Sequence, residues 1–178
     1  MSIQTKALIA LAIVWFAAMA GMHAFWFEPM TGGLRAPDSR LLGYTAEDFA
    51  AWQAALGAGG QAAFLRWHSG FADLVFPWLL MAALFFAMRE TLGRLPRFRL
   101  LPRWTQIVVP LALVTPYGLF DVLENGLVAD MLTGAVPVND ASVGLSSAYT
   151  VLKWTFIVLA FSALLVFRLA AARQSRGS

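Results

Sequence analysis

The sequence predicts an all-α polytopic membrane protein, a four-transmembrane-helix bundle with a short interfacial helix in the first outer loop. Composition is the first observation, because 60% of the 178 residues are hydrophobic and only 13% are charged. Soluble domains are about 45–50% apolar and about 25% charged. The second observation is a set of four long apolar stretches, at about residues 7–27, 62–88, 105–130 and 146–168. Each stretch is long enough to cross about 30 Å of hydrocarbon as a helix.

The first apolar stretch has some features of a secretory signal peptide, namely Lys6, an apolar run and the small-residue triplet Ala18-Met19-Ala20. The apolar run continues to Phe27, beyond that triplet, so we expect an uncleaved membrane anchor. With the three later spans it is expected to form a single domain that covers residues 1–178.

The loop between the first two spans contains a predicted helix at residues 45–57. Thr45 followed by Asp48 resembles a capping box with Asp in place of the usual Glu, and Gly57 is a plausible residue for the end of the helix. Apolar residues at spacings of three and four, Phe49, Trp52 and Leu56, give this helix one hydrophobic face. It is expected either to lie on the outer membrane interface or to serve only as a connector.

Arginine residues predict the orientation of the chain in the membrane. The loop between the second and third spans and the C-terminal tail are rich in arginine, while the loop between the third and fourth spans has acids and no base. By the positive-inside rule, the N- and C-termini are cytoplasmic in a bacterial inner (plasma) membrane. The net charge of +3 therefore reflects orientation, and no nucleic-acid partner is expected. The absence of cysteine excludes disulfides, zinc–thiolate sites and a cysteine nucleophile.

Ionisable residues within the spans all fall in the predicted outer half of the membrane. Those of the second, third and fourth spans lie at helical spacings that give each span one polar face, and the three faces are expected to converge. Convergence reduces the cost of about 2.5–3.5 kcal/mol for each charge placed in the middle of a span. The predicted polar cluster comprises Arg66, Asp73, Tyr117, Asp121, Glu124, Asn125, Tyr149 and Lys153.

The charges in this cluster do not balance. Three carboxylates, those of Asp73, Asp121 and Glu124, face Lys153 and Arg66, and Arg66 is close enough to the interface to extend out of the cluster. The surplus negative charge indicates a protonated acid or a bound cation, and the three acids are the candidate metal ligands. The alternative that Lys153 and Asp121 form a purely structural ion pair remains open. His23 and His68 are expected to form interfacial hydrogen bonds rather than to bind a ligand.

Three sequence motifs resemble a family of small four-span bacterial membrane proteins. The motifs are the run from Tyr44 to Pro77, the YGLFDVLENG segment around Asp121 and Glu124, and YTVLKW, which ends at Trp154. The resemblance covers about residues 44–154. It implies a four-span bundle and supports the choice of site residues, but it implies no activity. At Trp67-His68 the chain departs from the family pattern, which has aromatic or aliphatic residues there.

Three functions remain open from the sequence. The first is binding or transport of a cation, a proton or a polar lipid head group at the cluster. The second is an accessory or assembly subunit of a larger membrane complex, in which the cluster is structural. The third is a metal-dependent intramembrane enzyme acting on a lipid-like substrate, although the HExxH and GxSxG motifs are absent. The expected partners are the lipid bilayer and either further copies of the chain or a larger complex; no cofactor is assigned.

Overall fold

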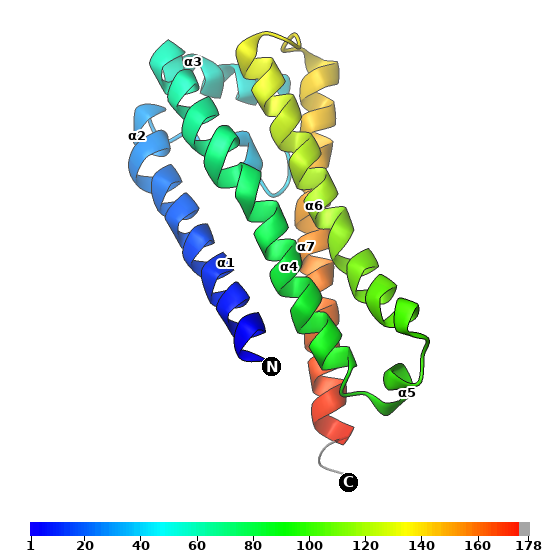
Figure 1. Cartoon of the computed structure of the whole chain (residues 1–178). Coiled ribbons are helices and arrows are strands. Elements are labelled where there is room, and N and C mark those ends of the chain that lie inside the picture. The colour runs from blue at the N-terminus through cyan, green and yellow to red at the C-terminus, as the bar shows by residue number, and fades with distance from the viewer. Residues whose placement is uncertain (175–178) are drawn as a thin grey trace.

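The computed structural model describes residues 1–174, and these fold into helices joined by short loops (Figure 1). No strand occurs in that range. The α-helices are α1 (Ile3–Met22), α2 (Glu28–Met30), α3 (Ala46–Ala63), α4 (Asp73–Leu92), α5 (Pro96–Arg99), α6 (Arg103–Thr133) and α7 (Asp140–Gln174). Two π-helical segments, η1 (His23–Phe27) and η3 (Phe64–Ala72), continue α1 and α3, and η2 (Pro37–Ser39) is a short 3₁₀ turn.

Four helical segments are long and apolar enough to cross a membrane, which confirms the predicted fold class. They are Ile3–Met30, Ala46–Leu92, Arg103–Thr133 and Asp140–Gln174. Each extends beyond the apolar stretch that predicted it, because the helices continue into their polar flanks. Large apolar side chains such as Phe25, Trp78 and Leu165 are exposed on the outside of the bundle. A bilayer would cover these side chains, so the chain is a multi-pass membrane protein.

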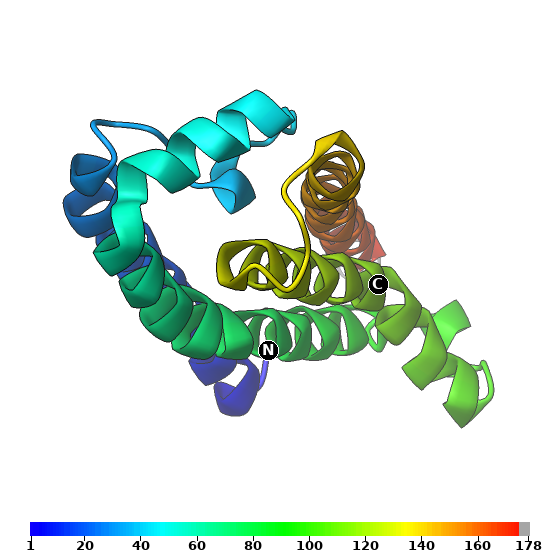
Figure 2. The same cartoon turned by 90° about the horizontal axis from the view of Figure 1, so that it is seen from above.

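Helix α3 consists of two helical runs separated by a kink at Gly57, and the first run begins and ends where the sequence predicts. Thr45 caps it, and the reciprocal hydrogen bonds of the capping box with Asp48 are both present. At Gly57 the backbone leaves helical geometry, with φ 60° and ψ 176°, a conformation that favours glycine. Helical geometry then resumes, so Gly57 ends the first helical run and bends the chain into the second span. Viewed from above, the segment before the bend lies across the end of the bundle (Figure 2).

The end of the bundle that carries α3 is closed by packed aromatic rings. Phe49 and Trp52 from α3 meet at 5.7 Å between ring centroids, and Trp52 meets Phe64 of η3 at 5.0 Å. The loop before α3 is fixed to α7, since the Tyr44 hydroxyl donates to the Ser146 hydroxyl at 2.7 Å. The loop and α3 therefore cover the end of the bundle.

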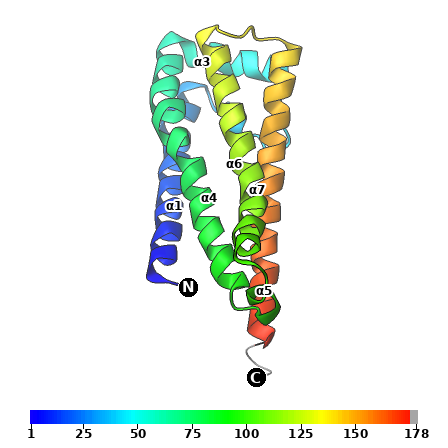
Figure 3. The same ribbon diagram turned by 45° about the vertical axis from the view of Figure 1, so that its right-hand side comes forward.

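The helices are packed unequally around the bundle. Helix α6 packs along α7 and against α4, while α1 packs mainly on α4. At the end opposite α3, Glu90 of α4 fixes the start of α1 by accepting from the Ser2 amide at 2.8 Å and from the Ser2 hydroxyl at 2.6 Å. The N-terminus, α5 and the last turns of α7 lie at this same end (Figures 1 and 3). Helix α1 is thus held by α4, and a cavity separates it from α7.

Candidate functional site: a buried charged cluster at the end of a cavity

Lys153 of α7 binds two acids of α6 inside the bundle. Its ammonium nitrogen lies 3.0 Å from Asp121 Oδ1 and 2.5 Å from Glu124 Oε2. The Thr150 hydroxyl, one turn before Lys153, donates to Glu124 Oε1 at 2.5 Å, and the Tyr117 hydroxyl donates to Asp121 Oδ2 at 3.3 Å. All five side chains are buried. The predicted pairing of Lys153 with Asp121 is present, and Glu124 shares the same ammonium.

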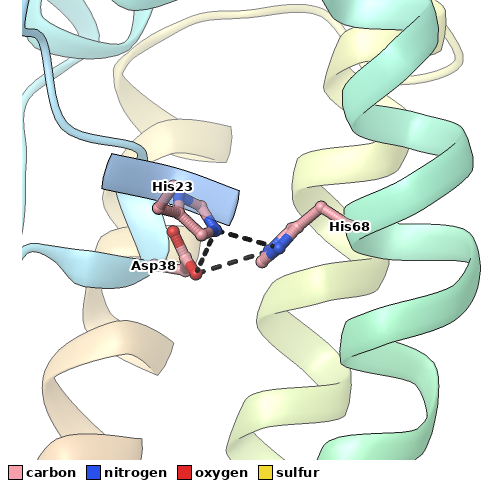
Figure 4. Close-up of side chains that lie close together, drawn as sticks. All are labelled: His23, Asp38 and His68. Carbon is pink, nitrogen blue, oxygen red and sulfur yellow. Dashed lines mark hydrogen bonds and ion pairs between the residues drawn. The ribbon is translucent and has the colours of Figure 1, made fainter. Parts of the chain in front are cut away.

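A second group of polar side chains surrounds His68, which is buried. His68 Nε2 lies 3.3 Å from Asp73 Oδ2 and 3.4 Å from Asp38 Oδ2. On its other side, His68 Nδ1 is hydrogen-bonded to His23 Nε2 at 3.1 Å, and His23 Nε2 lies 3.9 Å from Asp38 Oδ2 (Figure 4). Four separate parts of the chain therefore supply this group: η1, the loop at η2, η3 and the start of α4.

The two histidines lie where the backbone departs from α-helical geometry. Both lie in π-helical segments, His23 in η1 and His68 in η3. Insertions of this kind are common at functional sites. Backbone carbonyls in such a segment need other partners, and the Trp15 indole donates to the Ala72 carbonyl at 2.9 Å. The unusual backbone is thus stabilised by a side chain from α1.

Asp38 is held in the cluster by α7. The Trp154 indole, next to Lys153, donates to the Asp38 carbonyl at 3.1 Å. Burial raises the pKa of the Asp38 carboxyl, but His68 beside it, assisted by His23 and Lys153, lowers it more, so the pKa lies well below its ordinary value. Asp38 is therefore a carboxylate at neutral pH, and it carries its charge between the histidines and the lysine.

Residues of both groups line one cavity, whose remaining wall is apolar. It has a volume of about 1000 Å³, and His23, Asp38, Asp73, Tyr117, Asp121 and Lys153 line its polar end. Apolar residues of α1, α4 and α7 line the rest, as far as Arg168. Residues 153–168 of α7 follow its length, about 23 Å at the helical rise of 1.5 Å per residue. The cavity is thus a long apolar space with charged groups at one end.

Three of the predicted cluster residues lie outside the contacts described above. Arg66 is exposed, so its prediction as a cluster member is wrong; its long side chain extends away from the buried acids. Tyr149 is half-buried and packs on the Phe120 ring at 6.0 Å. Asn125 is half-buried, and its buried Nδ2 has no hydrogen-bond partner.

Among the described residues, the predicted metal ligands Asp73, Asp121 and Glu124 are not grouped closely enough to share one ion. The Lys153 ammonium lies between Asp121 and Glu124, whereas Asp73 faces His68. The expectation that His68 is interfacial is also wrong, because its side chain is buried among acids. The hydrogen bond expected for the histidines does occur, between the two rings.

Asp38 is the residue that sequence reasoning missed. It lies in a Gly- and Pro-rich loop, where an acid is ordinarily exposed to solvent, and no pattern of spacing connects it to the spans. Only the folding of that loop back against Trp154 brings it into the cluster.

Comparisons of this chain with family models, with curated proteins and with solved structures gave no match. The resemblance to a family of small four-span proteins therefore stays a prediction, and function has to be argued from the cluster and the cavity.

Proposed function

We propose that this chain is a protein of the bacterial inner membrane that binds a membrane lipid in the cavity between α1 and α7, with the polar head group at the charged cluster. The observation that carries the proposal is the form of the cavity, a long apolar wall that ends at buried charges. A membrane lipid has the same division between an apolar chain and a polar head.

The dimensions of the cavity support a lipid as the occupant. Its volume of about 1000 Å³ is at the upper end of the range for small-molecule sites, about 300–1000 Å³. Its length of about 23 Å along α7 exceeds the roughly 15 Å of one hydrocarbon leaflet. Because α1 packs mainly on α4, the space between α1 and α7 gives a hydrocarbon chain a route in from the bilayer.

The charges of the cluster favour a head group that carries a positive charge. Asp38, Asp73, Asp121 and Glu124 supply four carboxylates, against one ammonium from Lys153. Glu28 and Arg35 also line the cavity, and their opposite charges offset each other. The head group of phosphatidylethanolamine is zwitterionic, so its ammonium could pair with these carboxylates without adding net negative charge, whereas an anionic head group would add to the surplus.

A variant with a large side chain in the cavity tests the proposal. Ala20 lines the cavity from α1 and is exposed within it, so Ala20→Trp fills the space without displacing packed side chains. Ala18→Trp is the matched control, since Ala18 is an exposed residue of α1 that does not line the cavity. Lipids retained by each detergent-purified protein are extracted and quantified by mass spectrometry.

We expect the wild type and Ala18→Trp to retain about one phosphatidylethanolamine per chain after exhaustive washing, and Ala20→Trp to lose most of it. Equal retention by the two tryptophan variants would contradict the proposal. It would favour the alternative in which the cluster only braces a subunit of a larger complex.

The proposed orientation has its own test, because the chain has no cysteine. Arg97 lies in α5, at the end that carries the N-terminus, and Asn139 lies in the loop before α7. In spheroplasts, a membrane-impermeant maleimide is expected to label Asn139→Cys but not Arg97→Cys until the membrane is broken. The reverse pattern would overturn the assignment of the charged cluster to the outer half of the bilayer.

A further inference from the structure

We propose that His23, Asp38 and His68 form a binding site for a divalent transition-metal ion, with the Asp73 carboxylate beside it as a fourth donor. One ligand atom from each of the three lies within 4.8 Å of the other two (Figure 4). This site is separate from the Lys153 pair, and the proposal stands whether or not a lipid binds.

The distances between the donor atoms are close to those of a coordination shell. A metal ion with ligands at about 2.1 Å holds neighbouring ligand atoms about 3.0 Å apart in octahedral geometry and about 3.4 Å apart in tetrahedral geometry. His68 Nε2 lies 3.4 Å from Asp38 Oδ2 and 3.3 Å from Asp73 Oδ2. The His23 Nε2 to Asp38 Oδ2 distance is longer, 3.9 Å, and His23 Nε2 is hydrogen-bonded to His68 Nδ1, so binding of an ion by His23 Nε2 and His68 Nε2 would replace that hydrogen bond.

Buried polar atoms without hydrogen-bond partners point to the same place. Asp73 Oδ2 and Asp38 Oδ1 both lack a hydrogen-bond partner, and the Asp73 side chain is only 4% exposed. Buried polar atoms in folded proteins are almost always satisfied. A metal ion would engage the free electron pairs of these carboxylates.

The charge of the cluster, with its acids ionised, favours a cation of more than one unit. The hydrogen bond between His23 and His68 needs one ring as the acceptor, so at most one of the two is an imidazolium. Four carboxylates then face one ammonium and at most one imidazolium, which leaves at least two negative charges in the part of the chain described. A divalent ion bound to two neutral imidazoles reduces that surplus to one.

The chemistry of the donors selects the class of ion. Two imidazoles and a carboxylate suit Zn²⁺, Fe²⁺, Co²⁺ or Mn²⁺, while Ca²⁺ and Mg²⁺ prefer all-oxygen sites. His23, Asp38 and Asp73 line the cavity, so ligand positions not taken by the protein face its interior. If the proposed lipid binds there, its head group is within reach of the ion.

The test uses Co²⁺ as the probe, because its absorption spectrum reports the ligands that bind it. The full-length protein is purified in detergent, treated with a chelator and stripped of lipid by detergent exchange, so that failure of lipid binding cannot affect the result. The titrated proteins are the wild type, His23→Gln and Asp38→Asn, whose substituted side chains are half-buried and leave the core intact. Asp130→Asn removes an exposed acid of α6 and serves as the control.

We expect the wild type and Asp130→Asn to bind one Co²⁺ per chain, with absorption bands in the visible region that disappear when Zn²⁺ is added. His23→Gln and Asp38→Asn are expected to weaken binding at least tenfold, and His23→Gln to change the band positions. Weak, non-saturable binding, or binding equal in all four proteins, would show an adventitious ion only and overturn the proposal.

Discussion

Replacing Lys153 by methionine tests whether the cluster is held together as the geometry indicates. Lys153 is buried, and its ammonium nitrogen lies within hydrogen-bonding distance of both Asp121 and Glu124. Methionine has a similar length and no charge, so Lys153→Met leaves two buried carboxylates without a counter-ion. Removing one partner of a buried ion pair costs about 3–5 kcal/mol. Since Lys153 serves two acids, we expect a loss at the upper end of this range.

The size of this loss compared with total stability makes it measurable. Natural domains are stable by about 5–15 kcal/mol, so Lys153→Met should unfold at much lower denaturant concentration or temperature. The assay is circular dichroism in detergent micelles during urea or thermal unfolding. The difference in stability between the wild type and Lys153→Met should decrease as pH falls, because protonation of the two carboxylates removes the uncompensated charge.

A charge-neutral variant separates the electrostatic effect from loss of packing. The triple variant with Asp121→Asn, Glu124→Gln and Lys153→Met has no charge in this part of the cluster, and replacing a whole buried ion pair by neutral groups is often neutral or stabilising. We expect it to recover most of the stability lost in Lys153→Met. A loss of less than about 1 kcal/mol in Lys153→Met, as for an exposed ion pair, would refute the reasoning.

Three further substitutions test how the helices position the site. Gly118→Ala directs a methyl group into the Met81 thioether, so a loss of about 1–3 kcal/mol is expected in thermal unfolding, and adding Met81→Ala should relieve it. Gly57→Ala forces alanine into a conformation at φ 60° and should cost about 1–3 kcal/mol, measured in the same way. Trp154→Phe removes the hydrogen bond to the Asp38 carbonyl, so we expect a loss of about 1 kcal/mol together with weaker Co²⁺ binding in the titration described above. Unchanged Co²⁺ affinity in Trp154→Phe would show that this bond does not position Asp38.

The fold and half of the cluster could be predicted because they depend on local periodicity. Spans are determined by runs of apolar residues, and helical spacing places Asp121 and Glu124 on one face of α6. The pairing with Lys153 then follows because these charges lie at similar depth in the membrane, where an unpaired charge is costly. The Thr45 and Asp48 capping box is equally local, and it is present as predicted.

The other half of the cluster depends on features that single-sequence patterns do not report. Two π-helical segments turn His23 and His68 towards each other, and no residue pattern identifies such segments. Asp38 arrives through a loop whose position depends on a hydrogen bond from Trp154. The cavity follows from the unequal packing of α1, which a list of apolar stretches cannot give.

Photo-crosslinking with a lipid that carries a diazirine in its hydrocarbon chain tests the proposed function most directly. Phe16 and Phe161 line the cavity, whereas Val14 and Leu159 are exposed on the same helices but do not line it. In detergent micelles supplied with about one diazirine-labelled phosphatidylethanolamine per chain, so that no bilayer lipid covers the outside of the bundle, we expect the cross-links to concentrate at the first pair and to diminish in Ala20→Trp. Cross-links spread evenly over both pairs, and unaffected by Ala20→Trp, would show that the cavity does not hold the lipid.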